Sequence, residues 1–288
     1  MNIDKAKHLI AGLYDISLNC ICDDVICHPV RIIEASKSII GINPDKPETK
    51  LLDYCERYVS SFKHDEKDID FTNLTMPSVV TFLDLELSIL DKNKKKTFNS
   101  LYYLSRVSDG TQILEFLLEF SLKYCSKSYL LVWAVHRMHL FLGIENVLKS
   151  LIVCIESILR DVDVKRGNGD LDIDDCLKKY VFKEDTFKSF CSLYRIGKDD
   201  FVRSSKIRPL VLTAIKENFS FLDNNDNMVL HKEQEESGRS WILKHLSKID
   251  MKNIDNELIL NLDAARGVLK IIDNKNIELV WGRLNKVV

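Results

Sequence analysis

The sequence predicts a mainly α-helical protein, and the first reason is its scarcity of glycine and proline. Its 288 residues include 10 Gly and 5 Pro, about half and about a third of the average frequencies. Helix interiors exclude both residues, whereas turn-rich β folds need them. The second reason is that apolar residues recur every three to four positions through most of residues 1–162, the spacing of one helix face. We therefore expect an N-terminal multi-helix array or bundle with a smaller helical or α+β C-terminal domain.

The first part of the chain is predicted to form eight helices joined by short connectors. Pro29 and Pro77 suit first helical turns, where a missing N–H costs little. Gly41, Gly110 and Gly143 suit the left-handed position that ends a helix. Short connectors predict antiparallel neighbours, as in a bundle. The expected helices lie near residues 3–16, 29–40, 48–62, 77–91, 97–108, 111–126, 128–142 and 144–161.

Residues 111–162 are apolar around most of the helix circumference, so we expect the centre of the core there. Residues 163–170, with the sequence DVKRGNGD, combine two glycines, an asparagine and several charges. Such a composition is typical of a linker. The sequence thus divides into a helical domain over 1–162 and a smaller domain over 171–288.

The C-terminal part has a more mixed pattern. Two stretches, 219–230 and 268–284, place polar residues between apolar runs, so each could be a β-hairpin or a helical segment. Helices are expected near residues 171–181, 184–194, 206–219, 234–248 and 255–266.

Composition excludes several classes of function. The net charge of -2 gives no overall attraction to nucleic acid or to a membrane. The N-terminus has no secretory signal, and the longest clean apolar run, Tyr129 to Val135, is too short to span a bilayer. We therefore expect a soluble cytoplasmic protein whose eight cysteines are reduced. Glycine-rich phosphate loops and dinucleotide fingerprints are absent from the sequence, so no cofactor is expected.

One candidate site is a metal centre formed by Cys20, Cys22, Cys27 and His28. Three thiols and an imidazole within nine residues offer the ligand types that zinc prefers. However, a single residue separates Cys20 from Cys22, and no second cysteine pair follows. The alternative is an inter-helix loop with small buried thiols.

A second candidate is a ribonuclease site formed by an arginine and a histidine. Arg57 precedes His64, and Arg239 precedes His245, each pair separated by five or six residues. This spacing resembles the short Arg/His motif of the HEPN class of helical ribonucleases, in which the pair faces a dimer interface and acts on the RNA backbone. The alternative is two exposed pairs on helix faces.

A third candidate lies in the most apolar segment. His136 and His139 share one helix face, and Glu115 and Glu119 share a face of the preceding predicted helix. If these four side chains converge, they could form a catalytic cluster. The alternative is a polar stripe on an apolar helix, in which the histidines form hydrogen bonds to the carboxylates.

A fourth candidate is a basic patch formed by Lys198, Arg203, Lys206 and Arg208. The predicted helix 206–219 and a possible hairpin follow this patch along the chain. The patch could therefore be the surface of a winged-helix fold that contacts phosphates. Lysine-rich loops are more often simply solvated.

Because no catalytic motif is evident, the leading prediction is a protein–protein interaction or scaffold protein. One alternative is a nucleic-acid-acting protein, either a HEPN-like ribonuclease or a winged-helix binder. Another is a helical enzyme that uses the Glu/His cluster. A protein partner is expected, nucleic acid and homo-oligomerisation are possible, and no membrane partner is expected.

Overall fold

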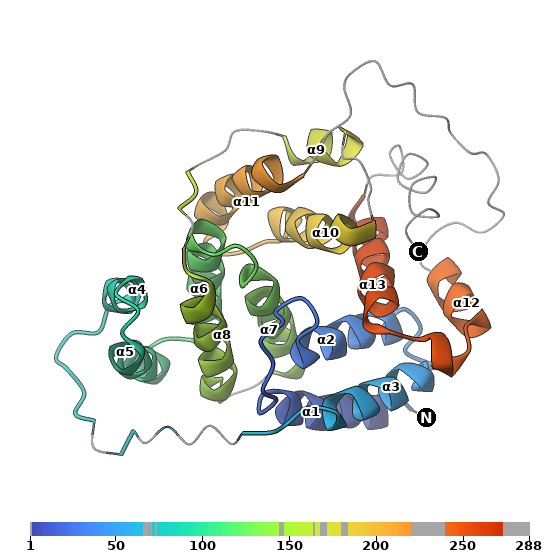
Figure 1. Cartoon of the computed structure of the whole chain (residues 1–288), viewed down its shortest axis with the longest axis horizontal. Coiled ribbons are helices and arrows are strands. Elements are labelled where there is room, and N and C mark those ends of the chain that lie inside the picture. The colour runs from blue at the N-terminus through green and yellow to red at the C-terminus, as the bar shows by residue number, and fades with distance from the viewer. Residues whose placement is uncertain are drawn as a thin grey trace.

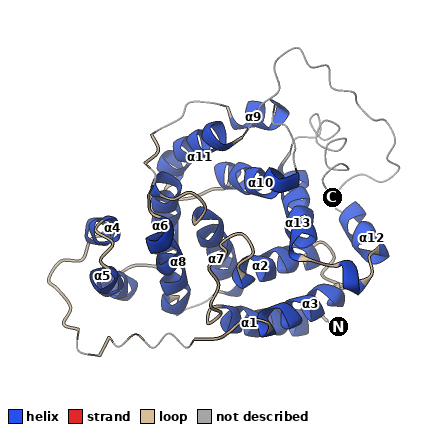
Figure 2. Cartoon of the chain, viewed as in Figure 1, coloured by secondary structure: helices blue, strands red, loops and turns tan. Residues whose placement is uncertain are grey.

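The structure is a computed structural model, and the residues that it describes are 2–65, 69, 71–72, 74–143, 147–163, 165–167, 172–179, 184–219 and 240–272. Within them the chain forms thirteen α-helices and one 3-10 helix, with two isolated β-bridges in place of any strand (Figures 1 and 2). The prediction of a mainly helical protein is therefore confirmed.

The first eight helices agree closely with the apolar periodicity of the sequence. They are α1 (Ile3–Ser17), α2 (Pro29–Ile40), α3 (Thr49–Ser60), α4 (Phe82–Leu90), α5 (Lys94–Val107), α6 (Gly110–Tyr124), α7 (Tyr129–Leu142) and α8 (Leu148–Asp161). The later helices are α9 (Ile173–Lys179), α10 (Glu184–Lys198), α11 (Ser204–Asn218), α12 (Ser240–Lys248), the 3-10 helix η1 (Met251–Asn253) and α13 (Asn256–Ile271).

Some helix ends differ from the prediction. Pro29 opens α2 and Gly143 ends α7 in the left-handed region at φ 64°, as expected. Gly41, however, has an ordinary right-handed φ of -68°. Gly110 begins α6 after the Asp109 N-cap instead of ending α5.

Pro77 lies outside any helix, because the side chain of Thr81 caps the N-terminus of α4 at the amide of Asp84. Helix α5 also begins earlier than the expected residue 97, since Asn93 caps it and Lys94 is its first residue. At the other end of the chain, residues 268–271 continue α13. The remainder of the two possible hairpins, 220–230 and 273–284, lies outside the described residues.

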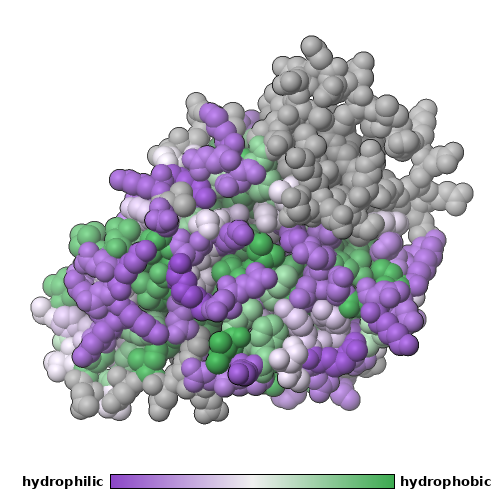
Figure 3. All heavy atoms as spheres, in the orientation of Figure 1, coloured by the Kyte–Doolittle hydropathy of each residue, from purple (hydrophilic) through white to green (hydrophobic). Residues whose placement is uncertain are grey.

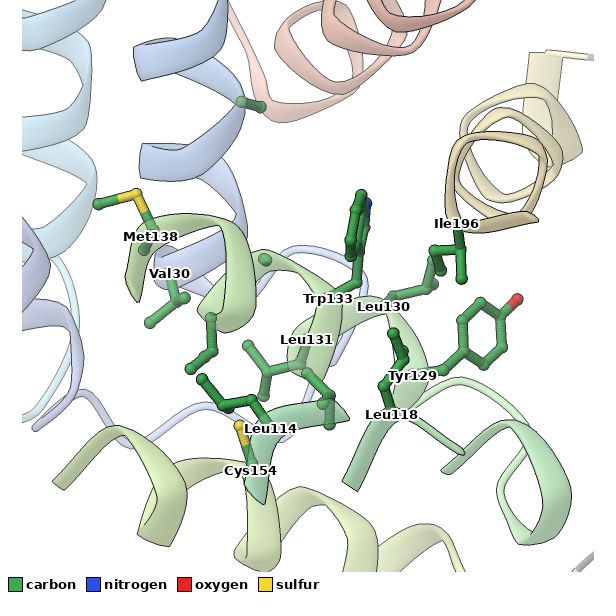
Figure 4. Close-up of a cluster of buried hydrophobic side chains, with 14 of the residues drawn as sticks. Val30, Leu114, Leu118, Tyr129, Leu130, Leu131, Trp133, Met138, Cys154 and Ile196 are labelled. Atoms are coloured by element: carbon green, nitrogen blue, oxygen red, sulfur yellow. The ribbon is translucent and has the colours of Figure 1, made fainter. Parts of the chain in front are cut away.

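The helices pack around α2 and α7. Helix α7 packs against α6 and α8 on one side and against α2 and α10 on another, while α13 covers α2 and α10 (Figure 1). Leu114, Leu131 and Cys154, from α6, α7 and α8, are buried together (Figure 4). Helices α6, α7 and α8, which span most of residues 111–162, thus contribute many side chains to the buried cluster. Helices α4 and α5 form a pair at one edge of the molecule, attached through α5 to α8.

The predicted linker is tied to the end of α6. The amide of Asp163 donates to the carbonyl of Tyr124, and the Arg166 guanidinium donates to the carbonyls of Leu122 and Cys125 at 2.8 and 2.6 Å. Arg166 also donates to Glu217 of α11 at 2.9 Å. Buried apolar residues on both sides of the linker belong to one cluster. The division into two domains stays a prediction.

Within the described part of the chain, no helix combines the length and the apolar character needed to cross a bilayer. All eight cysteines are free thiols in the structure.

Candidate interaction surface and predicted site residues

Helix α4 is apolar on two opposite faces. Leu85, Ser88 and Ile89 are buried on the face that packs toward α5. Leu83, Leu87 and Leu90 lie on the opposite face and are 59%, 46% and 39% exposed. Because residues i, i+4 and i+7 share one side of a helix, these three leucines form a continuous apolar stripe.

The stripe is extended by the segment that leads into α4. Met76 and Val79 are 41% and 68% exposed just before the helix begins. We call Met76, Val79, Leu83, Leu87 and Leu90 the α4 surface. Apolar side chains are visible at the same edge of the molecule where α4 lies (Figure 3). A surface helix normally presents a polar face opposite its buried face, so the α4 surface is the exposed feature that most needs an explanation.

Carboxylates lie beside the α4 stripe. Asp84 and Asp91 are exposed, and the Asp84 carboxylate accepts a hydrogen bond from Thr81 at 2.7 Å. Glu86 interacts with Lys123 and with the Tyr124 hydroxyl, at 3.8 and 3.3 Å. Asp84 and Asp91 therefore place negative charge at the border of the stripe, whereas Glu86 is already paired with Lys123.

Three of the predicted zinc ligands, Cys20, Cys22 and His28, line one pocket, and each also has a local contact. The His28 ring accepts a hydrogen bond from the amide of Val30 at 3.2 Å and caps α2. The buried Cys20 thiol lies 3.8 Å from His64 Nδ1, and Cys22 donates to the carbonyl of Asp24. Burial raises the pKa of the Cys20 and Cys27 thiols to about 11.

Among the described residues, no group of three or more His, Cys, Asp or Glu side chains is arranged to hold a metal ion.

The predicted Arg/His pairs are placed only in part. Arg57 is exposed and its Nε donates to the carbonyl of Asp53 in its own helix, whereas His64 lies beside Cys20. His245 stacks on Trp241 within α12, with ring centroids 5.2 Å apart. Arg239 lies outside the described residues. The ribonuclease interpretation therefore stays a prediction.

The predicted Glu/His cluster is divided between two environments. The Glu115 carboxylate accepts the backbone amides of Val202 and Arg203, at 3.3 and 3.0 Å, and Glu119 accepts Arg203 Nε at 2.5 Å. The two glutamates thus bind the loop between α10 and α11.

The histidines of that cluster lie among different neighbours. His136 is buried against the rings of Trp133 and Phe201, with centroids 5.7 and 5.4 Å away. Neither of its ring nitrogens, nor Nδ1 of His139, has a hydrogen-bond partner in the described structure. Burial lowers the pKa of His136 to about 4 and also lowers that of His139. His136 is therefore a neutral ring near pH 7.

The predicted basic patch is also divided. Lys198 pairs with Asp174 at 2.6 Å, and Arg203 pairs with Glu119. Lys206 and Arg208 are exposed. Since two of the four cations already face carboxylates, less positive charge is left for a phosphate backbone. Nucleic-acid binding stays a prediction.

A buried ionic network that was not predicted from the sequence joins α10 to α13. One Asp263 carboxylate accepts Arg195 Nη1 at 2.7 Å and Arg266 Nε at 2.8 Å, and all three side chains are less than 10% exposed. Burial alone would raise the pKa of Asp263, but the charges of the two arginines hold it below its usual range. In the sequence, Asp263 and Arg266 have the spacing of an ordinary surface ion pair, so only their burial could have revealed the network.

A related pair joins α2 to α7. Arg137 Nε donates to Glu34 at 2.8 Å, and Arg137 Nη2 donates to the Ser38 hydroxyl at 3.0 Å.

Comparisons with protein-family models, with curated proteins and with solved structures found no match to this chain.

Proposed function

We propose that this chain is a protein-binding protein whose partner covers the α4 surface. The observation that supports the proposal is the second apolar face of α4, formed by Leu83, Leu87 and Leu90 on the side opposite its buried face. An exposed apolar patch of contiguous residues is typical of an interaction site.

The expected partner contributes an amphipathic helix. Leucines at i, i+4 and i+7 are the pattern with which one helix packs along another. Because the exposed carboxylates of Asp84 and Asp91 border the stripe, we expect Lys or Arg beside the apolar face of the partner helix, where opposite charges favour encounter and orientation.

The finer predictions about organisation remain part of this proposal. An N-terminal bundle and a smaller C-terminal domain, divided at 163–170, would place α4 in the bundle. A cytoplasmic location agrees with the eight free thiols.

The test is site-specific photo-crosslinking in cells. A photoreactive residue replaces Leu87 in one variant and Leu83 in a second, and mass spectrometry identifies the attached peptide. The matched control replaces Leu140 of α7, which is 59% exposed but lies outside the α4 surface. We expect positions 83 and 87 to capture the same helical peptide with basic flanks, and position 140 not to capture it.

Two results would contradict the proposal. One is the absence of any adduct beyond that of the Leu140 control. The other is capture of a peptide from this chain itself, which would make the covering molecule a second copy. In addition, the double variant Leu83→Glu and Leu87→Glu, which carries no photoreactive residue, should no longer co-purify with the captured partner. Its free energy of unfolding should change by less than about 0.5 kcal/mol.

A further inference from the structure

A pocket of about 130 Å³ lies where α7, α10 and α13 meet, and its lining holds more cations than carboxylates. Its volume is well above the roughly 10–15 Å³ that one water molecule needs on this measure. The charged side chains around it are Arg137, Arg195, Lys198, Asp199, Arg266 and Lys270. Most of these cations are already paired: Arg137 with Glu34, Lys198 with Asp174, and both Arg195 and Arg266 with Asp263. With Asp199 counted as well, the five cations exceed the carboxylates around the space by one charge.

Two buried donors in the lining have no acceptor. Arg195 is 7% exposed and Trp133 is 4% exposed, yet neither Arg195 Nη2 nor Trp133 Nε1 has a hydrogen-bond partner in the described structure. Trp133 projects from α7 toward α10, with its ring nitrogen on the side of that helix (Figure 4). A guanidinium and an indole N–H can only donate. A molecule that satisfies both must therefore be an acceptor.

The local charges also favour an anion. Asp263 is shared by two guanidiniums, those of Arg195 and Arg266, so one negative charge balances two positive charges there. Lys270 is exposed at the mouth of the pocket and adds a further cation. Burial strengthens electrostatic interactions because it removes competing water.

Gly267 makes this arrangement sterically possible. A Cβ atom at this position would lie 2.3 Å from Arg195 Cδ and 2.5 Å from Arg195 Nε. The absence of a side chain therefore lets Arg195 lie directly across α13. Glycine inside a helix is less favourable than alanine by about 1 kcal/mol. The space that Gly267 leaves for the Arg195 side chain explains why glycine is present at this position.

We propose that this pocket binds a phosphate group, either inorganic phosphate or the phosphate monoester of a small molecule. Arginine forks bind phosphate with several parallel hydrogen bonds. A phosphate offers three or more acceptor oxygens, enough for Arg195, Trp133 and the lysine at the mouth together. The pocket is formed by α7, α10 and α13, away from the α4 surface, so the inference is independent of the proposed function.

The test is a titration of the full chain with inorganic phosphate, followed by calorimetry and by the indole N–H signals of its three tryptophans. The Trp133→Phe variant identifies the Trp133 signal. We expect saturable one-to-one binding with a selective shift of that signal. A parallel titration with glycerol phosphate distinguishes the source: tighter binding than inorganic phosphate indicates a monoester, and equal or weaker binding indicates the free ion.

Three variants make the test specific. Arg195→Lys keeps the charge but loses the second donor of the fork, and should weaken binding about tenfold. Lys270→Gln alters an exposed residue that cannot endanger folding, and should weaken binding about threefold. Lys252→Gln removes an equally exposed lysine that does not line the pocket, and should leave binding unchanged.

Two outcomes would overturn the proposal. The first is no saturable binding at millimolar phosphate. The second is binding that all three variants leave unchanged or that Lys252→Gln weakens as much as Lys270→Gln, which would indicate non-specific attraction to surface charge.

Discussion

Helix α7 contacts two neighbourhoods of opposite character. Toward α6 and α8 it presents apolar side chains such as Leu131, packed with Leu114 and Cys154. Toward α2 and α10 it presents Trp133 and Arg137, beside buried ion pairs. The apolar side is stabilised by the burial of apolar surface away from water. The polar side is stabilised by ion pairs in which each charge needs its partner to remain buried. The two sides should therefore respond very differently to single substitutions.

The largest effect should come from the polar side. Asp263→Asn leaves Arg195 and Arg266 buried without their shared carboxylate, and breaking a buried pair costs about 3–5 kcal/mol. Urea unfolding of the purified chain measures this loss of free energy.

The control for this change is Asp53→Asn on the exposed face of α3, which should change the stability by less than about 0.5 kcal/mol. If Asp263→Asn were equally mild, the network would not contribute to stability in the way that the ion pairs indicate.

The apolar side should show a slightly smaller effect. Leu131→Ala removes a side chain that is 1% exposed and leaves a cavity, at a cost of about 3 kcal/mol. Leu140→Ala, in the same helix but 59% exposed, is the matched control and should cost less than about 1 kcal/mol. Equal losses in the two variants would mean that α7 does not pack against α6 and α8 as described.

The smallest effect is a pH dependence that arises beside the aromatic rings of this helix. Burial lowers the pKa of His136 to about 4 in the folded chain, against about 6.5 when unfolded. The unfolded state therefore binds the proton first. The contribution of neutral His136 to the free energy of unfolding is complete above pH 6.5 and falls as the pH drops toward 4. Between pH 6.5 and pH 5 this loss amounts to about 1.5 kcal/mol.

Unfolding measured across this pH range should show that slope, and His136→Phe should flatten it. His8→Gln, which changes an exposed histidine, should leave the slope as it is. A wild-type stability that does not fall between pH 6.5 and pH 5 would contradict the buried neutral state of His136.

The contrast between the two sides also explains what the sequence could predict. Apolar periodicity identified α6, α7 and α8 because burial of Leu114 or Leu131 repeats with the helical turn. Helix ends were less predictable. Gly110 and Pro77 fit the rules for a stop and a start, but Asp109 and Thr81 provide the caps that decide where α6 and α4 begin.

The candidate sites were harder to predict, for a physical reason. Charged residues such as Arg195 and Asp263 have the spacing of solvent-facing pairs, and only tertiary packing buries them. Glu115 and Arg203 are separated by 88 residues along the chain, so no local pattern could pair them. The exposed leucines of α4 could not be predicted for the opposite reason. In the sequence, an exposed apolar stripe has the same spacing as a buried one, and only the packing of the neighbouring helices distinguishes them.

The hydrogen bonds of Arg166 have a consequence for proteolysis. A trypsin-like protease must take an arginine side chain into its specificity pocket before it cuts the following bond. The Arg166 side chain is already engaged with the carbonyls of Leu122 and Cys125 and with Glu217. Cleavage after Arg166 would therefore require these bonds to open first, which makes the rate of that cut a natural reporter of how often α6 and α11 separate.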